Sequence, residues 1–208
     1  MRRIGMKKPK LRELKEAIKV VFTGPYTTKF PKVPSVPPET FRGKPQYDPN
    51  WCIGCGACAE VCPAEAIQVE DIVEDGRAFR RITLHYDNCI YCGQCHAYCP
   101  TGQGIDYTQE YDLATTDRSE AVERVEKDLA TCEVCGAIIA PWDQLRWVAQ
   151  RLGTLAYSNP TLLLALYREM GLIVETPPPA EEEILRSAHA RLLCAKCRRA
   201  VVIREQWI

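Results

Sequence analysis

The sequence predicts an α+β fold, in which a small cysteine-rich core lies between an N-terminal helix with an arm and a C-terminal helical region. Three observations lead to this class. The spacing C-x2-C-x2-C-x3-C, followed by proline, occurs twice between residues 52 and 100. Apolar residues at helical spacing come before and after this doubled run, and strand-like segments lie between its copies. Two further C-x2-C pairs occur in the C-terminal region.

The composition argues against several classes of protein. The 208 residues include 27 basic and 27 acidic side chains, so the net charge is zero and no global field favours nucleic acid. The twelve cysteines come in C-x2-C groups, which suit metals better than a secreted disulfide framework. No signal peptide is visible and cytosolic thiols stay reduced, so we expect a cytosolic protein. No apolar stretch reaches membrane-spanning length.

The N-terminal region, residues 1–46, is predicted to be a helix followed by a proline-rich docking arm. Gly24-Pro25 ends the helical pattern. An amphipathic helix of this kind can pack on its own domain, and it can equally lie on a membrane surface or a partner subunit. Five prolines then keep residues 31–48 out of helices and central strands, so this stretch is an arm or a spacer. The apolar stripe of the helix consists of Leu11, Leu14, Ile18, Val21 and Phe22.

The core, residues 47–112, contains the doubled motif. This spacing is the bacterial-type ligand run for two [4Fe–4S] clusters, each of which needs four thiolates. Zinc is a poor alternative, since zinc sites do not require three closely spaced cysteines together with a fourth from elsewhere in the chain. The last cysteine of each run ligates the other cluster in two-cluster ferredoxins. We therefore assign to cluster 1 the residues Cys52, Cys55, Cys58 and Cys99. We assign to cluster 2 the residues Cys89, Cys92, Cys95 and Cys62.

The segments between and around the two motifs are expected to enclose the clusters. Residues 66–70 and 79–86 are predicted strands, joined by a turn at Asp75-Gly76. Four isoleucines are expected to shield the clusters from water, and these are Ile53, Ile67, Ile90 and Ile105. The core is therefore predicted to be a bacterial two-[4Fe–4S] ferredoxin-like domain that carries electrons.

The C-terminal region, residues 113–208, is predicted to be mainly helical. Helices are expected over residues 118–129, 143–152, 161–170 and 180–193, with a proline break at 177–179 and a short strand over 200–204. Four thiolates at a tetrahedral site suit structural zinc, in the manner of a zinc ribbon with a long insertion. A single iron of the rubredoxin type and a disulfide pair are the alternatives. These metal candidates are Cys132, Cys135, Cys194 and Cys197.

Several segments together carry a resemblance to a known family. They are residues 41–45 (FRGKP), both cluster motifs with the hairpin between them, and residues 109–114 (QEYDLA). On these segments the chain resembles the two-cluster ferredoxin-like subunit of membrane-bound [NiFe] hydrogenases of the formate hydrogenlyase type. It is also similar to the equivalent hydrophilic subunit of respiratory complex I. A comparable C-terminal pair of C-x2-C groups occurs in the formate hydrogenlyase subunit, whereas complex I subunits generally lack one.

The resemblance implies a non-catalytic electron-transfer subunit of an oxidoreductase complex. The implied partners are [NiFe] hydrogenase-like small and large subunits, a membrane-arm subunit, and an upstream redox module or ferredoxin. The implied location is peripheral, on the cytoplasmic side of the cell membrane, with membrane contact through a partner and no nucleic acid. A complex I-like quinone oxidoreductase subunit, a free ferredoxin-type shuttle and a redox-inactive interaction module are the alternatives.

Overall fold

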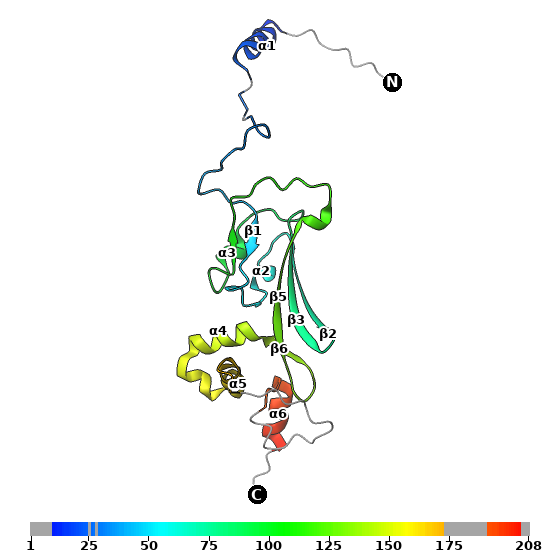
Figure 1. Ribbon diagram of the computed structural model, residues 1–208, viewed down its shortest axis with the longest axis vertical. Helices are drawn as coiled ribbons and strands as arrows, with labels where there is room; N and C mark the ends of the chain where they lie inside the picture. The colour runs from blue at the N-terminus through cyan, green and yellow to red at the C-terminus, as the bar shows by residue number, and fades with distance from the viewer. Residues whose placement is uncertain (1–9, 25, 28, 173–190, 205–208) are drawn as a thin grey trace, which may run out of the picture. The chain divides into compact units, whose positions relative to one another are not determined.

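The computed structural model describes residues 10–204, apart from residues 25, 28 and 173–190 (Figure 1). The chain divides into two compact units, Met1–Phe41 and Arg42–Ile208. The expected proline break at 177–179 and most of the expected helix over 180–193 lie outside the described residues. Residues 191–193 are described and are not helical. The mixed α+β class is confirmed by the elements set out below.

The first unit contains the predicted amphipathic helix, which is confirmed as α1 (Leu11–Thr23). The helix ends at Gly24, which has a φ of 74° and donates its N–H to the Val20 carbonyl at 2.8 Å. No residue of α1 is buried. The whole apolar stripe is therefore exposed, with Leu11, Val21 and Phe22 each at least 80% accessible. The other described residues of this unit form no helix or strand.

The two halves of the cysteine-rich core fold in a similar way. Strand β1 (Pro45–Tyr47) precedes the first motif and pairs antiparallel with β4 (Ile105–Tyr107), which follows the second. Each motif contains a one-turn helix, α2 (Ala57–Glu60) or α3 (Gln94–Ala97). Gly56 and Gly93 begin these helices in the left-handed region, with φ of 78° and 89°. The repeat in the sequence is thus a repeat in local structure.

A four-stranded antiparallel sheet joins this core to the C-terminal region. Its strands β2 (Ile67–Glu74), β3 (Arg77–His85), β5 (Val122–Thr131) and β6 (Ile138–Pro141) are adjacent in that order (Figure 1). The predicted hairpin is confirmed, although both its strands extend further toward the turn than expected. Asp75 and Gly76 have φ of 50° and 80°, the two positive values that a two-residue type I′ turn needs.

The predicted helix over residues 118–129 is wrong. This segment forms a short 3-10 turn, η1 (Arg118–Glu120), and most of strand β5. Residues 125–129 alternate between the two faces of the strand: Val125, Lys127 and Leu129 are buried, while Glu126 and Asp128 are exposed. A lysine at a buried position concealed this alternation, because charged residues are almost never buried unless they are paired.

The two helices expected over 143–152 and 161–170 are confirmed to within a residue. They are α4 (Trp142–Leu152) and α5 (Pro160–Glu169), separated by η2 (Gly153–Ser158). The predicted strand over 200–204 is wrong, because these residues belong to helix α6 (Ala195–Arg204). Cys197 and Val201, four residues apart, are both buried, which is helical spacing. None of the helices in the described residues is both long and apolar enough to cross a membrane.

Candidate metal centres

The first candidate centre is a cavity next to the β1–β4 ribbon. It is walled by apolar side chains, among them Ile53, Ile82 and Ile105, and by the ring of Tyr47. Three of its cysteines come from the first motif and the fourth from the second. These cysteines are Cys52, Cys55, Cys58 and Cys99.

The second cavity mirrors the first. Ile67, Leu84 and Tyr107 contribute to its wall. Three of its cysteines come from the second motif and one from the first, and these are Cys62, Cys89, Cys92 and Cys95. Each cavity therefore collects three cysteines of one motif and the last cysteine of the other. None of these eight cysteines forms a disulfide.

Backbone and hydroxyl groups lie close to several of these sulfurs. The N–H of Ala66 donates to Cys62 Sγ and that of Tyr91 to Cys89 Sγ, both at 3.4 Å. Thr101 Oγ1 lies 3.3 Å from Cys99 Sγ. Such contacts stabilise negative charge on sulfur and are one of the protein's controls on the potential of a cluster.

Burial raises the pKa of four of these eight thiols. It raises the pKa of Cys58 to about 12 and that of Cys95 to about 11. Burial also raises the pKa of Cys52 and of Cys89. A group of buried thiolates is stable only beside positive charge, because desolvation disfavours the charged form. Iron supplies that charge, so the donor set fits a [4Fe–4S] cluster.

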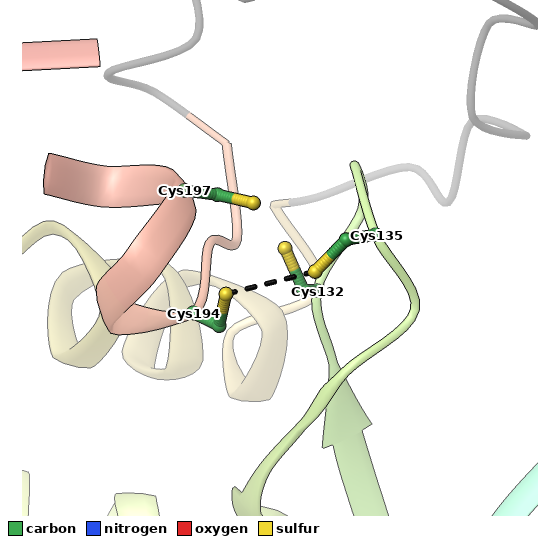
Figure 2. A group of neighbouring side chains, drawn as sticks. All are labelled: Cys132, Cys135, Cys194 and Cys197. Atoms are coloured by element: carbon green, nitrogen blue, oxygen red, sulfur yellow. Dashed lines mark hydrogen bonds between the residues drawn. The ribbon is translucent and has the colours of Figure 1, made fainter. Parts of the chain in front are cut away.

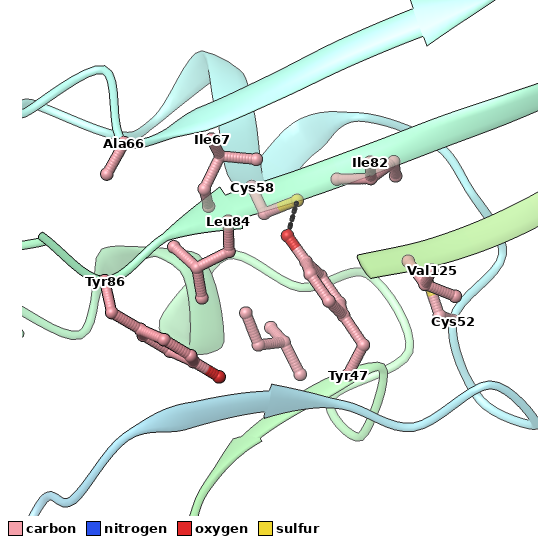
Figure 3. Packing of buried hydrophobic residues seen from close by; sticks show 10 residues of the cluster. Tyr47, Cys52, Cys58, Ala66, Ile67, Ile82, Leu84, Tyr86 and Val125 are labelled. Atoms are coloured by element: carbon pink, nitrogen blue, oxygen red, sulfur yellow. Dashed lines mark hydrogen bonds between the residues drawn. The ribbon is translucent and has the colours of Figure 1, made fainter. Parts of the chain in front are cut away.

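Two tyrosines at the ends of the β1–β4 ribbon support the same fit. Tyr47 Oη lies 3.7 Å from Cys58 Sγ, within hydrogen-bond reach of sulfur (Figure 3). Tyr107 lines the second cavity, and its hydroxyl is buried with no hydrogen-bond partner among the described residues. An unsatisfied buried hydroxyl costs free energy. A cluster sulfur in that cavity would accept its hydrogen bond.

The expected shielding by four isoleucines holds for three of them. Ile53, Ile67 and Ile105 are buried. Ile90 lines the second cavity but is 63% exposed, so the prediction is wrong for this residue. The physical reason is that the second motif lies at the surface, where Cys92 is exposed as well.

The third candidate centre is formed by the four C-terminal cysteines, whose ligand atoms all lie within 4.8 Å of one another (Figure 2). Cys132 directly follows β5 and Cys135 lies in the next loop, whereas Cys194 and Cys197 come from the start of α6. The sulfurs of Cys135 and Cys194 are 3.6 Å apart. A tetrahedral zinc site with Zn–S bonds of about 2.3 Å places its sulfurs about 3.8 Å apart. The geometry therefore fits a four-thiolate metal site.

The electrostatics of this site also favour a cation. Burial raises the pKa of Cys132, but hydrogen bonds from the backbone of Cys194, Cys135 and Val134 outweigh it and bring the pKa down to about 7. Burial and the neighbouring sulfurs raise the pKa of Cys197 to about 12. Four thiolates cannot share so small a space without a positive ion between them. The donor set suits zinc and iron alike.

Sequence reasoning missed three residues beside the first two cavities. Tyr47 and Tyr107 follow no spacing rule that would have indicated a role. The helix predicted over residues 118–129 includes Lys127. In the structure this residue lies on the buried face of β5, and its ammonium donates to Asp143 Oδ2 at 2.7 Å. The available signal was a lysine between two apolar residues at strand spacing, Val125 and Leu129.

Comparisons with known proteins match the part of the chain that contains both cysteine motifs. A family described as a 4Fe-4S dicluster domain matches residues 51–103. Formate hydrogenlyase subunit 6 of Escherichia coli (strain K12) is 38% identical over 117 residues, which are 56% of this chain and 63% of that protein. NADH-quinone oxidoreductase subunit I 2 of Geobacter metallireducens is 32% identical over 120 residues, which are 55% of this chain and 91% of that protein.

Two further comparisons cover less of the relative. NAD(P)H-quinone oxidoreductase subunit I of Gloeobacter violaceus is 32% identical over 99 residues, which are 46% of this chain and 47% of that protein. A chain of an archaeal membrane-bound sulfane sulfur reductase is 32% identical, with 56% of this chain and 62% of that chain covered and a TM-score of 0.37. The chain thus spans 63% and 47% of the first two curated relatives.

Proposed function

The chain belongs to the family of two-[4Fe–4S] subunits that includes subunit I of NADH-quinone oxidoreductase, and on this premise we propose that it relays electrons within a membrane-bound oxidoreductase complex. The observation that carries the proposal is the pair of cavities, each lined by four cysteines. When bound, each cluster supplies one-electron redox chemistry. No substrate site is proposed for this chain.

The ligands proposed for the two clusters follow the cavities. Those of cluster 1 are Cys52, Cys55, Cys58 and Cys99. Those of cluster 2 are Cys89, Cys92, Cys95 and Cys62. The crossing cysteines, Cys62 and Cys99, tie the two halves of the core together and hold the two sites close to one another. The apolar walls keep water from the first site, while Tyr47 and Tyr107 offer hydroxyl groups to the two sites.

The complex proposed is a membrane-bound [NiFe] hydrogenase of the formate hydrogenlyase type. Identity is 38% to formate hydrogenlyase subunit 6, compared with 32% to the two quinone oxidoreductase subunits described above. The proposed partners are hydrogenase-like small and large subunits, a membrane-arm subunit, and a redox module or ferredoxin as donor. The proposed location is the cytoplasmic side of the membrane, where the exposed stripe of α1 would contact a partner or the membrane surface.

A second candidate is a subunit of a complex I-like quinone oxidoreductase. The observation that favours it is coverage, since the match spans 91% of the Geobacter metallireducens subunit. Both candidates need the same two clusters, and they differ in the enzyme to which the electrons pass.

The four-cysteine site is proposed to hold one structural zinc ion. Cys132 and Cys197 are buried and pack with Leu193 and Val201, so a metal there would join the end of β5 to α6. Iron is the alternative, since it accepts the same four thiolates.

The test of the electron-relay proposal is metal and sulfide analysis combined with electron paramagnetic resonance (EPR). We expect about eight irons, about eight sulfides and about one zinc per chain, from two cubes and one four-thiolate site. Dithionite should produce the EPR signals of reduced [4Fe–4S] clusters. A chain that holds iron but gives no such signal would instead be a redox-inactive interaction module.

The complex is tested by purification of the tagged chain from native membranes. Recovery of a nickel-containing hydrogenase subunit would support the first candidate. Recovery of quinone reductase activity without nickel would favour the second. A free monomer in the soluble fraction would contradict both and would support a ferredoxin-type shuttle.

A further inference from the structure

One face of the four-stranded sheet leads from the apolar core to the loop of the first motif. Ile82 of β3 faces Val125 of β5 across the sheet, and two residues further along Arg80 faces Lys127. Alternate residues of a strand share a face, so Lys127 lies on the same face as Val125. Ile82 lines the first cavity. This face therefore ends in two basic side chains beside the first-cluster loop.

Lys127 spans that loop. Its side chain is 10% exposed, and its ammonium donates to the carbonyl of Pro49 as well as to Asp143 Oδ2, the latter at 2.7 Å. The stem of the side chain packs on Gly54, since a Cβ at Gly54 would lie 3.0 Å from Lys127 Cγ. The lysine thus contacts the segment that carries Cys52 both before and after that cysteine.

Asp143 brings a separate part of the chain to this point. It lies in the first turn of α4, and its carboxylate is 32% exposed. Its second oxygen is 3.6 Å from Arg146, which also pairs with Glu169 of α5. Of this ion pair, it is the Lys127 ammonium that contacts the cysteine loop.

The neighbouring cation on the sheet is differently placed. Arg80 donates from Nη1 to the Gly54 carbonyl at 3.1 Å. Asp71 holds its guanidinium with two hydrogen bonds, of 2.6 and 2.9 Å. Arg80 is therefore compensated within the β2–β3 hairpin itself, whereas Lys127 is compensated from the C-terminal region.

We propose that the buried Lys127 and the partly exposed Asp143 form an ion pair through which the C-terminal region sets the reduction potential of cluster 1. This inference rests on the proposed electron-relay function. Reduction adds one negative charge to a cluster, and a buried cation beside it stabilises the reduced form, because Coulomb interactions are strong where water is excluded. Lys127 raises the potential by this effect, and the Asp143 carboxylate offsets part of it.

The test compares reduction potentials in the full chain carrying both clusters, measured by EPR-monitored redox titration. Lys127→Met removes the cation and keeps the apolar stem, so one of the two midpoint potentials should fall. Asp143→Asn removes the carboxylate and leaves the cation uncompensated, so the same midpoint should rise. The double variant should lie between these two. The other midpoint should move less in every variant.

The matched control is a pair on the same sheet with no contact to the cysteine loop. Arg77 and Asp128 are 2.8 Å apart, and both side chains are about 60% exposed. Asp128→Asn should leave both midpoints unchanged, because water screens exposed charges.

Shifts in the same direction for Lys127→Met and Asp143→Asn, or no shift in either, would overturn the inference. If the Lys127→Met variant does not assemble cluster 1, the Asp143→Asn variant still tests the inference, because it retains the lysine and every cysteine. Failure of the electron-relay proposal is distinguishable, since the unaltered chain would then show no reducible clusters at all.

Discussion

The two cluster cavities have the same cysteine spacing but different surroundings. Cys52 and Cys58 of the first cavity are each 9% exposed, and Lys127 and Pro141 pack on the loop between them. In the second cavity Cys92 is exposed and Ile90 is 63% exposed. Identical ligand runs therefore do not produce identical sites. Strands β5 and β6 of the C-terminal region cover the loop of the first motif, and solvent access and nearby charge are controls on cluster potential.

The largest expected effect tests which cluster is ligated by the last cysteine of each motif. Cys99→Ser should remove cluster 1, although Cys99 belongs to the second motif, because its sulfur lines the first cavity. Iron content should fall by roughly half, and one of the two reduced-cluster EPR signals should disappear. Cys62→Ser is the matched variant and should remove the other signal. Cys55→Ser, in the first motif, should abolish the same signal as Cys99→Ser, because both sulfurs line the first cavity. If Cys99→Ser and Cys55→Ser abolished different signals, the crossed assignment would be wrong.

The next largest effect tests whether the four-cysteine site of the C-terminal region can be lost without loss of the two clusters. Cys197→Ser should release the zinc and loosen the buried group of Cys132, Leu193 and Val201, since metal binding contributes folding free energy at such sites. We expect a lower thermal midpoint, loss of about one zinc, and retention of both clusters. Metal analysis with differential scanning calorimetry measures this. Simultaneous loss of iron would show that the two regions depend on one another.

A smaller effect tests the close packing over the first loop. Gly54→Ala places a Cβ within about 3 Å of Lys127 and Pro141, at a φ of 69°. Gly102 has a similar φ of 72° but open space around its Cβ position, so Gly102→Ala controls for backbone strain of about 1 kcal/mol. We expect Gly54→Ala to lower the unfolding midpoint and the occupancy of cluster 1 more than its control. Equal effects would mean that backbone strain alone matters.

The smallest effect compares the hydroxyl groups offered to the two cavities. Tyr107→Phe should lower the potential of cluster 2, and Tyr47→Phe that of cluster 1, because each change removes a hydrogen-bond donor that stabilises negative charge on sulfur. Redox titration followed by EPR measures both shifts. A shift of the wrong cluster, or a rise in potential, would contradict the proposed contacts.

Local patterns made much of the fold predictable. The Asp75-Gly76 turn between two strand-like segments predicted the β2–β3 hairpin, and helical periodicity predicted α1, α4 and α5. Strand β5 was missed because Lys127 occupies a buried position that would ordinarily be apolar. Helix α6 was not predicted because its first turn contains a candidate metal ligand. The first buried residue of this helix is Cys197, so the apolar pattern that would indicate a helix is absent there.

The sequence by itself indicated the chemistry of the core, since the thiolate spacing of the doubled motif is the ligand run of two [4Fe–4S] clusters. It also determined that the core is doubled. Only the tertiary structure decided that the two halves differ, because the pairing of β3 with β5 brings Lys127 to one cysteine loop and not to the other, and Asp143 of α4 meets Lys127 there. That contact joins residues far apart in the chain. No local spacing rule encodes it, because burial and charge compensation arise only when the sheet has formed.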